Sequence, residues 1–406
     1  MTKLQKKYAF VFLLLLCFVI NVWQYLNFVK TGKCSNTNIY FIYAFLYCLI
    51  LAVFHSFNVI KINLLIFITC LLSLESYYIF FEKGILTYNE QLGEKQYVSV
   101  YMQGYKYGYD AFNNWISKPN STDIQYNKDF TYKKKYNSFG LRDVELDTAV
   151  LNRKEVVVIL GDSFTEGNGT PQDSTMPALL EQKLNASDAG RYKIINAGVA
   201  GSDPVYEYQL YVTKLAALKP QQVILATNVS DIFDLMCKKG AERFAGTKIQ
   251  YYKAPVWEYL YANSRVFRLL VVHVFDVDPY LLITNTEKTK RFEKAYSDFK
   301  LYIQKFESTT KQSNSTFTVV YTPHLFDFKN VSSTMHLDDA FEQRLKLDYS
   351  KNTFNNSFVF LRDSIIKYKL IDTAKMDAYY WKHDYHFKPL GYDIWARFME
   401  MELKKQ

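Results

Sequence analysis

Cysteine, glycine and proline are all scarce in this sequence. Its 406 residues include 5 Cys, 15 Gly and 9 Pro. So few cysteines exclude a small secreted scaffold held together by disulfides, and so few glycines and prolines exclude a collagen-like or low-complexity chain. Because 49% of the residues are hydrophobic and 22% are charged, the chain is also too apolar to be disordered. Its length predicts two to three structural units.

Charged residues are nearly absent from three apolar runs near the N-terminus. The runs cover residues 9–29, 39–60 and 64–81, and only His55 interrupts the second. Because a helix needs about 20 apolar residues to cross a bilayer, the sequence predicts three transmembrane helices within an anchor of residues 1–83. The last two would form a hairpin that turns at 61–63. A cleaved signal peptide is the alternative for the first run, but no small-residue cleavage pattern follows it.

Basic residues around the first run favour one orientation. Three lysines lie in residues 1–7, and Lys30 and Lys33 follow the run. Positive charge concentrates on the cytoplasmic side of membrane proteins, so the N-terminus is predicted to be cytoplasmic. Three crossings would then place residues 84–406 outside the cytoplasm, and we expect an integral protein of a bacterial inner membrane.

The third run contains one acidic residue, Glu75. We expect its side chain to reach the outer interface beside Tyr77 and Tyr78. A functional intramembrane acid is the alternative.

Two cysteines, Cys34 and Cys237, lie outside the apolar runs. Their spacing gives no reason for a disulfide, so we expect two thiols, with a single bridge as the alternative. The net charge is +9, and the run Lys133–Lys135 is predicted to be a solvated face. Since no nucleic-acid motif accompanies it, we expect an anionic membrane or glycan surface as a neighbour and no nucleic-acid partner.

Strand and helix patterns alternate in the second half of the chain. Alternation of this kind predicts an α/β fold, a doubly wound parallel sheet with helices on both faces. Residues 84–136 read as an irregular lead-in, and about 233–288 as an inserted cap over the strand ends. The strands are expected at 156–160, 192–198, 222–227 and 317–323, and the helices at 176–184, 204–218, 288–312, 357–368 and 390–403.

Polar motifs follow the predicted strands, where a doubly wound sheet carries its functional groups. The first, GDSFTEG, starts at Gly161 and places Ser163 at a tight strand-to-helix turn. A serine there can be a nucleophile, and its backbone N–H can stabilise an oxyanion. The alternative is that Asp162 or Ser163 only caps the following helix.

Three more motifs complete the set. NAGVAGS offers the backbone N–H of Gly201, and TNVSDIFD offers Asn228 and Ser230 as side-chain donors. The C-terminal HDYHFKPLGY holds Asp384 two residues before His386. Each motif alone is more often structural than catalytic. Four motifs with suitable catalytic residues, in this chain order and each at a strand end or helix start, indicate one active site.

Together these motifs resemble the SGNH or GDSL hydrolase superfamily over residues 137–406. The resemblance implies a three-layer, flavodoxin-like SGNH domain with Ser163 as nucleophile, His386 as base and Asp384 as the acid that orients the imidazole. Gly201 would be an oxyanion donor. It implies no metal and no cofactor.

Two departures from the family pattern stand out. Many members place the acid three residues before the histidine, where this chain has His383. The two-residue spacing of Asp384 is similar to that of SGNH proteins of polysaccharide O-acetylation. The third-block asparagine maps without gaps onto Ser230, so either Ser230 or Asn228 would be the third oxyanion donor.

The expected chemistry is acyl transfer through an acyl-serine. Release to water would make the protein an esterase, and release to a sugar hydroxyl an O-acyltransferase acting on acyl, in particular acetyl, esters of envelope polysaccharide. A membrane-bound O-acyltransferase is a candidate partner. The alternative from another class is a catalytically inactive glycan-binding or scaffolding subunit, which the altered third block favours.

Aromatic residues are abundant, at 17% of the chain. Outside the apolar runs they gather at 88–112, 249–262 and 379–387. Composition leaves open two explanations for this abundance of aromatic residues. One is a surface near Ser163 on which sugar rings stack, and the other is codon bias.

Overall fold

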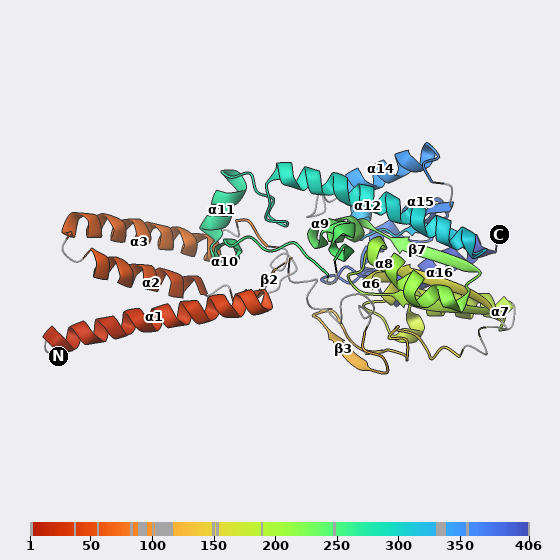
Figure 1. The fold of residues 1–406 in the computed structure, drawn as a ribbon, viewed down its shortest axis with the longest axis horizontal. Coiled ribbons are helices and arrows are strands. Elements are labelled where there is room, and N and C mark those ends of the chain that lie inside the picture. Colours follow the sequence, from red (N-terminus) through yellow and green to blue (C-terminus); the bar gives the residue numbers. More distant parts are fainter. Residues whose placement is uncertain are drawn as a thin grey trace. The chain divides into compact units, whose positions relative to one another are not determined.

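The computed structural model describes two compact units within the chain (Figure 1). The first contains residues 1–103 and 253–289, and the second contains residues 104–252 and 290–406. The described residues run from 3 to 404, with gaps at 36–37, 55–56, 82–83, 88–95, 100, 102–116, 148–150, 152–153, 188–189, 247–248, 330–337 and 355–356. Much of the aromatic stretch 88–112 therefore lies outside the described residues.

The first unit is built on three apolar helices, as predicted. They are α1 (Lys3–Thr31), α2 (Asn38–Val53) and α3 (Asn58–Phe80). By length and composition, Tyr8–Thr31 and Asn58–Phe80 could each cross a membrane. Helix α2 has 16 residues, which span about 24 Å, less than the roughly 30 Å of a hydrocarbon core.

The predicted turn at 61–63 is wrong. Helix α2 ends at Val53 and α3 begins at Asn58, so Lys61 lies inside the first turns of α3. There its Nζ lies 3.3 Å from Asn58 Oδ1. A lysine near a helix end can extend its charged group into a polar environment without interrupting the helix. The polar residues within 61–63 were therefore mistaken for a turn.

The prediction for Glu75 is also wrong, because this side chain is fully buried. Its carboxylate accepts hydrogen bonds from Ser264 Oγ at 2.9 Å, from the Arg265 N–H at 2.5 Å and from the Val266 N–H at 3.2 Å. These donors lie at the start of α11 (Arg265–His273). Glu75 therefore satisfies the unpaired N–H groups at a helix N-terminus.

The segment predicted as one cap over 233–288 is divided between the two units. Its first part ends α9 (Val229–Lys238) and continues to residue 252 in the second unit. Residues 253–289, which include α10 (Glu258–Asn263) and α11, group with the apolar helices. The first unit also holds a small antiparallel pair, β1 (Lys33–Ser35) and β2 (Gln96–Val98). Cys34 and Cys237 are both buried and belong to different units.

The second unit contains the predicted doubly wound sheet. Its five strands are all parallel, in the order β6-β5-β7-β8-β9. The strand bounds are β5 (Glu155–Gly161), β6 (Tyr192–Gly198), β7 (Gln222–Thr227), β8 (Thr316–Tyr321) and β9 (Ser357–Phe360). The α/β prediction is confirmed. Because both faces of the sheet are covered, its central strands are continuous apolar runs such as VVVIL.

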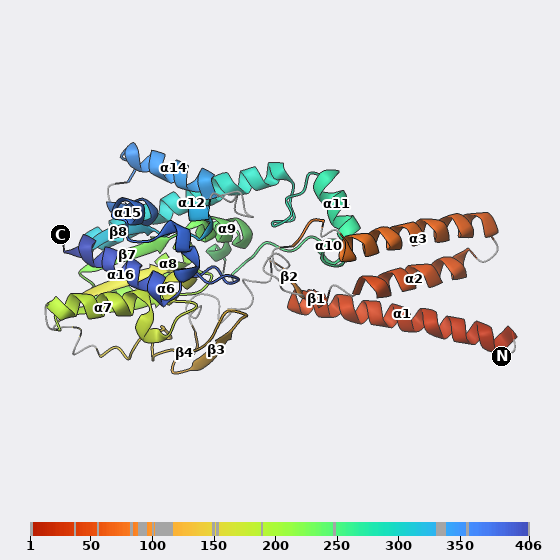
Figure 2. The same cartoon turned by 180° about the vertical axis from the view of Figure 1, so that it is seen from behind.

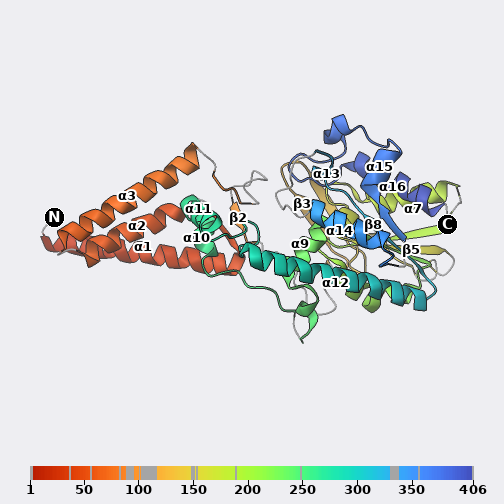
Figure 3. The same cartoon turned by 90° about the horizontal axis from the view of Figure 1, so that it is seen from above.

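Helices cover the sheet on both sides. On one face α7 (Met176–Ser187) and α16 (Pro389–Leu403) lie side by side (Figure 2) and pack against Val157 and Ile159 of β5. On the other face is α12 (Asn285–Gln312), with the sheet between it and α7 (Figure 3). The remaining helices are α6 (Ser163–Glu166), α8 (Pro204–Leu210), α13 (Phe326–Lys329), α14 (Asp338–Ser350) and α15 (Leu361–Lys367).

Two segments of this unit fold differently from what the sequence predicted for them. Residues 357–368 were expected to form a helix, but they contain β9 followed by α15. The strand reads SFVF, and a short continuous apolar run cannot be distinguished from a buried helix segment by periodicity alone. The other difference is a hairpin of β3 (Thr122–Tyr126) and β4 (Thr131–Lys135), where an irregular lead-in was expected. Its exposed Lys133 and Lys135 fit the predicted solvated face, but Lys134 between them is buried.

The aromatic residues at the C-terminal end of the chain serve mainly as core. Tyr380 and Phe387 are almost fully buried in the cluster that contains α7 and α16. A sugar-stacking role for these two rings is therefore excluded by their burial.

Candidate active site

Ser163 is the first residue of α6, directly beyond the end of β5. Asp162 is the helix cap, and its Oδ1 accepts a hydrogen bond from the Phe164 N–H at 2.9 Å. The turn requires a glycine on the neighbouring strand, because a Cβ at Gly198 would lie 2.1 Å from the Glu166 backbone nitrogen. Since Asp162 supplies the cap, the Ser163 hydroxyl is available for chemistry.

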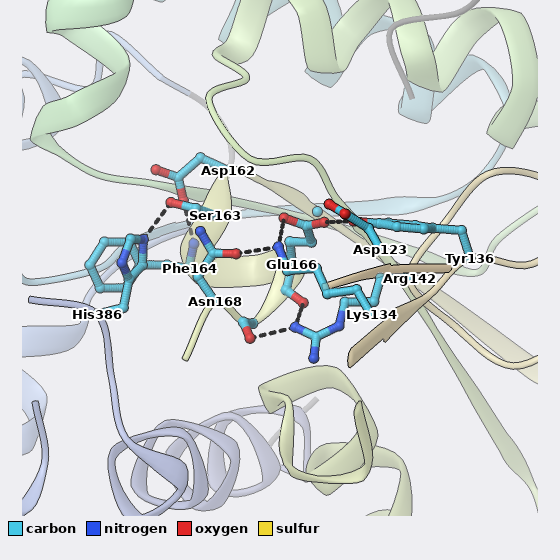
Figure 4. A network of polar contacts seen from close by, with 12 residues as sticks. Asp123, Lys134, Tyr136, Arg142, Asp162, Ser163, Phe164, Glu166, Asn168 and His386 are labelled. Carbon is cyan, nitrogen blue, oxygen red and sulfur yellow. Dashed lines mark hydrogen bonds and ion pairs between the residues drawn. The ribbon is translucent and has the colours of Figure 1, made fainter. Parts of the chain in front are cut away.

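Ser163, His386 and Asp384 form one chain of hydrogen bonds. Ser163 Oγ lies 2.6 Å from His386 Nε2, a contact drawn in Figure 4. His386 Nδ1 lies 2.5 Å from Asp384 Oδ1. The structure thus brings together all three residues that the sequence predicted as nucleophile, base and acid, with the acid at the two-residue spacing.

The charges of this chain are arranged for a general base. Burial opposes the charged form of His386, but the Asp384 carboxylate outweighs it, so the pKa of the imidazole lies above its ordinary value. Burial likewise opposes ionisation of Asp384, but His386 outweighs it and the pKa of the carboxyl is lowered. The histidine can therefore accept the Ser163 proton while Asp384 remains a carboxylate.

Tyr385, between the acid and the base, has φ 65°. A left-handed backbone is unusual for a bulky residue. It lets the Asp384 carboxylate fold back onto an imidazole only two residues away. A conformation of this kind stores about 1–3 kcal/mol at a functional site.

The tip of the β3–β4 hairpin supports the acid, and the sequence had not revealed it. Asn127 Nδ2 donates to Asp384 Oδ2 at 2.7 Å. Asp129 accepts from the backbone N–H groups of His383 and Asp384 at 2.7 and 2.9 Å, and its other oxygen lies 2.8 Å from His383 Nδ1. The turn sequence NKD was the available signal, because Asn and Asp mark a hairpin turn.

Asn228 and Ser230, the two candidates for the third oxyanion donor, both bind Asp162. Asn228 Nδ2 donates to Asp162 Oδ2 at 3.0 Å, and Ser230 Oγ lies 2.8 Å from the same oxygen. Ser230 Oγ also lies 2.6 Å from Asn228 Oδ1. A hydroxyl has one proton, which these acceptors use, whereas an amide nitrogen has two. The geometry therefore favours Asn228 over Ser230 as the donor.

Gly201 lies in the turn after β6, with φ 73°. The Val199 N–H and Ser202 Oγ both donate to the carbonyl oxygen of Gly161, at 2.9 and 3.1 Å. These bonds hold the turn against the end of β5, two residues before Ser163.

A buried polar network stabilises the far end of the nucleophile turn (Figure 4). Glu166 accepts from Lys134 Nζ at 3.0 Å and from the Tyr136 hydroxyl at 3.0 Å. Burial raises the pKa of Glu166, but Lys134 and Arg142 outweigh it, so the net shift is downward. Arg142 in turn donates to the Glu166 and Thr170 backbone carbonyls at 3.1 and 2.5 Å.

His324 is another residue that the sequence had not indicated. It follows β8, and its Nε2 lies 3.1 Å from Asn228 Oδ1. Its ring packs against Phe164 with 4.9 Å between centroids, and His386 contacts Phe164 at 4.6 Å. Among the described residues, no group of three or more His, Cys, Asp or Glu is placed to hold a metal ion.

Comparison with solved structures finds several similar proteins. Similar solved structures include a lipase/acylhydrolase from Enterococcus faecalis, with 11% identity, TM-score 0.36, and coverage of 62% of this chain and 96% of that one. Another is the acetylxylan esterase Axe2 from Geobacillus stearothermophilus, with 14% identity, TM-score 0.38, and coverage of 61% and 93%. The comparison with curated proteins found no match.

The family model gives the assignment. The model of GDSL-like lipase/acylhydrolases matches residues 157–399, more than half of the chain and all five strand ends of the sheet. The chain therefore belongs to the GDSL-like lipase/acylhydrolase family, the SGNH hydrolases that its motifs resembled.

Proposed function

We propose that this protein is a membrane-anchored, extracytoplasmic serine esterase or O-acyltransferase. Its substrates would be acyl esters, in particular acetyl esters, of cell-envelope polysaccharide. Family membership supports ester hydrolysis, and the hydrogen-bonded chain of Ser163, His386 and Asp384 is the observation that carries the enzymatic role. The anchor is supported by the two helices long and apolar enough to span a bilayer.

The reaction would proceed through an acyl-serine. His386 Nε2 takes the Ser163 proton as Oγ bonds to the ester carbonyl carbon, and the carbonyl oxygen becomes an oxyanion. The backbone N–H groups of Ser163 and Gly201 and the Asn228 amide would stabilise that oxyanion. As the intermediate collapses, the alcohol leaves with the proton from His386.

The second half-reaction decides between the two activities. Water or a sugar hydroxyl loses its proton to His386 and attacks the acyl-serine, and His386 then returns that proton to Ser163 Oγ as the acyl–oxygen bond breaks. Water gives a carboxylic acid and makes the protein an esterase. A sugar hydroxyl gives a new ester and makes the protein an O-acyltransferase. In that case a separate partner protein, a membrane-bound O-acyltransferase, would supply the acyl groups.

A serine-dependent turnover assay tests the proposal. Full-length protein in detergent is incubated with p-nitrophenyl acetate beside Ser163→Ala, and a glycan acceptor is then added to look for acylated product. We expect turnover by the wild type and none above background by the variant. If the folded wild type shows neither turnover nor an acyl adduct, the chain acts as a binding or scaffolding subunit and the proposal is wrong.

A further inference from the structure

The geometry points to His324 as a positioning residue that orients the side-chain amide of Asn228 toward the developing oxyanion. This inference rests on the acyl-serine chemistry proposed for Ser163. The Nε2 atom of His324 lies 3.1 Å from Asn228 Oδ1. Since an amide oxygen only accepts, the imidazole donates its Nε2 proton. Burial lowers the pKa of His324 to about 4, with the His386 charge acting in the same direction and Asp162 opposing it.

The two ends of an asparagine amide have the same shape but opposite polarity. A flipped Asn228 would present an oxygen, not an N–H, to the oxyanion. Two contacts of fixed polarity oppose that flip: the Ser230 backbone N–H donates to Oδ1 at 2.7 Å, and the Asp162 carboxylate accepts from Nδ2 at 3.0 Å. His324 adds a third contact, with its Nε2 at 3.1 Å from Oδ1, in the tautomer that carries the proton on Nε2. The Ser230 hydroxyl cannot discriminate, because a hydroxyl donates or accepts as needed. His324 is therefore a side chain that reinforces this orientation from the Oδ1 side, while Asp162 does so from the Nδ2 side.

His324 is itself held in place. Its backbone N–H donates to Asp327 Oδ2 at 2.7 Å. Its ring packs on Phe164, the residue after the nucleophile. His324, which follows β8, thereby contacts Phe164 after β5 and Asn228 after β7.

Four variants test the inference. We expect Asn228→Ala to lower kcat by about 10²- to 10³-fold, as loss of one oxyanion donor does. His324→Leu should lower kcat by about 10- to 100-fold with little change in KM, because the contact of Asn228 with the oxyanion, which His324 supports, is made mainly in the transition state. His324→Gln, whose terminal N–H can occupy the Nε2 position, should recover to within about threefold. The double variant His324→Leu with Asn228→Ala should be no slower than Asn228→Ala alone.

Labelling of Ser163 with a fluorophosphonate provides the control for folding. If the two losses multiply, or if His324→Gln is as slow as His324→Leu while both label fully, His324 does not act through Asn228. If the wild type itself neither turns over substrate nor labels, the proposed function fails instead.

A different set of contacts carries a second inference, that α11 rests in the interface of the membrane that α3 enters. This rests on the proposed anchoring. Glu75, which binds the N-terminus of α11, is buried five residues before Phe80, the end of α3. Five helical residues span about 8 Å. Helix α11 runs crosswise to α3 (Figures 1 and 3), as a helix lying in a membrane surface would.

The exposed side of α11 and of the turn that follows it combines apolar residues with the polar His273 and Asp276. Leu270 is 42% exposed, and Val274 and Phe275 in the turn that follows are 66% and 58% exposed. The other side is fixed, because Arg268 donates to the carbonyl oxygens of residues 261, 262 and 85. An amphipathic helix fastened near the end of a spanning helix fits the boundary between lipid headgroups and acyl chains.

Spin labels in nanodiscs of phosphatidylethanolamine and phosphatidylglycerol test this placement. With the exposed Cys70 replaced by Ser, a label is attached at Phe275→Cys, at Phe67→Cys in α3, or at Ile124→Cys in the second unit. We expect oxygen to relax the labels at 275 and 67 more than a water-soluble nickel chelate does, and the reverse at 124. A label at 275 relaxed mainly by nickel, or shielded from both reagents as a protein contact would be, contradicts the inference. A label at 67 relaxed mainly by nickel contradicts the anchoring itself.

Discussion

The nucleophile and the acid–base pair of this active site are supported in two different ways. Ser163 lies in a strand-to-helix turn whose far end is held by the buried Lys134–Glu166 pair. Asp384 and His386 lie on a loop that is held by side chains of a hairpin tip, Asn127 and Asp129. A buried ion pair therefore stabilises the nucleophile turn, whereas hydrogen bonds from a hairpin distant in sequence orient the acid–base pair. Variants on the two sides should therefore fail in different ways.

The largest effect is expected at the acid. Asp384→Asn should lower kcat by about 10⁴-fold, because the imidazole loses the partner that holds its tautomer and stabilises its charge. Activity rises with pH as His386 loses its proton, and the wild-type midpoint should lie above the ordinary value of 6.5. In Asp384→Asn the residual activity should show a lower midpoint. A pH–rate profile of kcat/KM measures both, and an unchanged midpoint would exclude Asp384 as the residue that raises the pKa.

On the nucleophile side the main effect should be on stability. Lys134→Met leaves the buried Glu166 carboxylate without its ion-pair partner, although Arg142 stays nearby, and should lower the free energy of unfolding by about 3 kcal/mol. Urea unfolding of the full chain in detergent measures it. The matched controls, Lys133→Met and Lys135→Met, change exposed side chains of the same strand and should cost less than about 0.5 kcal/mol. Equal losses in all three variants would mean that the pair is not what stabilises the turn.

On the acid–base side the hairpin tip should affect rate more than stability. Asn127→Ala removes the donor to Asp384 and also the acceptor of the Asp129 and Phe130 N–H groups, so it should lower kcat by about tenfold and the free energy of unfolding by about 1 kcal/mol. Asn127→Asp should be slower still, because it places a second carboxylate beside the first. Steady-state kinetics beside urea unfolding separates the two effects. A variant that loses stability without losing rate would assign the hairpin a purely structural role.

The smallest effect is expected at Tyr385. Both Tyr385→Asn and Tyr385→Val lose the ring, but Asn tolerates a left-handed backbone and a β-branched residue does not. We expect the Asn variant to be more stable than the Val variant by about 1–2 kcal/mol and faster by a few-fold. Equal behaviour would show that the left-handed conformation at 385 is not needed for the short spacing between acid and base.

The sequence was most informative where one segment carried its own pattern. Continuous apolar runs predicted β5 and β7, and the motifs around Ser163 and His386 predicted which side chains meet. What it missed depends on contacts between distant segments. Nothing local marks Lys134 as the buried member of a lysine run, Glu75 as the cap of α11, or His324 as the partner of Asn228. Strand β9 was missed because its short, continuous apolar run does not distinguish a strand from a buried helix segment.

The most direct test of the proposed acyl-serine mechanism is to identify the residue that carries the acyl group. The full chain is mixed briefly with p-nitrophenyl acetate, quenched in acid, digested and examined by mass spectrometry beside Ser163→Ala. We expect an acetyl group on Ser163 that disappears as substrate is exhausted and is absent from the variant. An acetyl group on another residue, or turnover that survives Ser163→Ala, would contradict it.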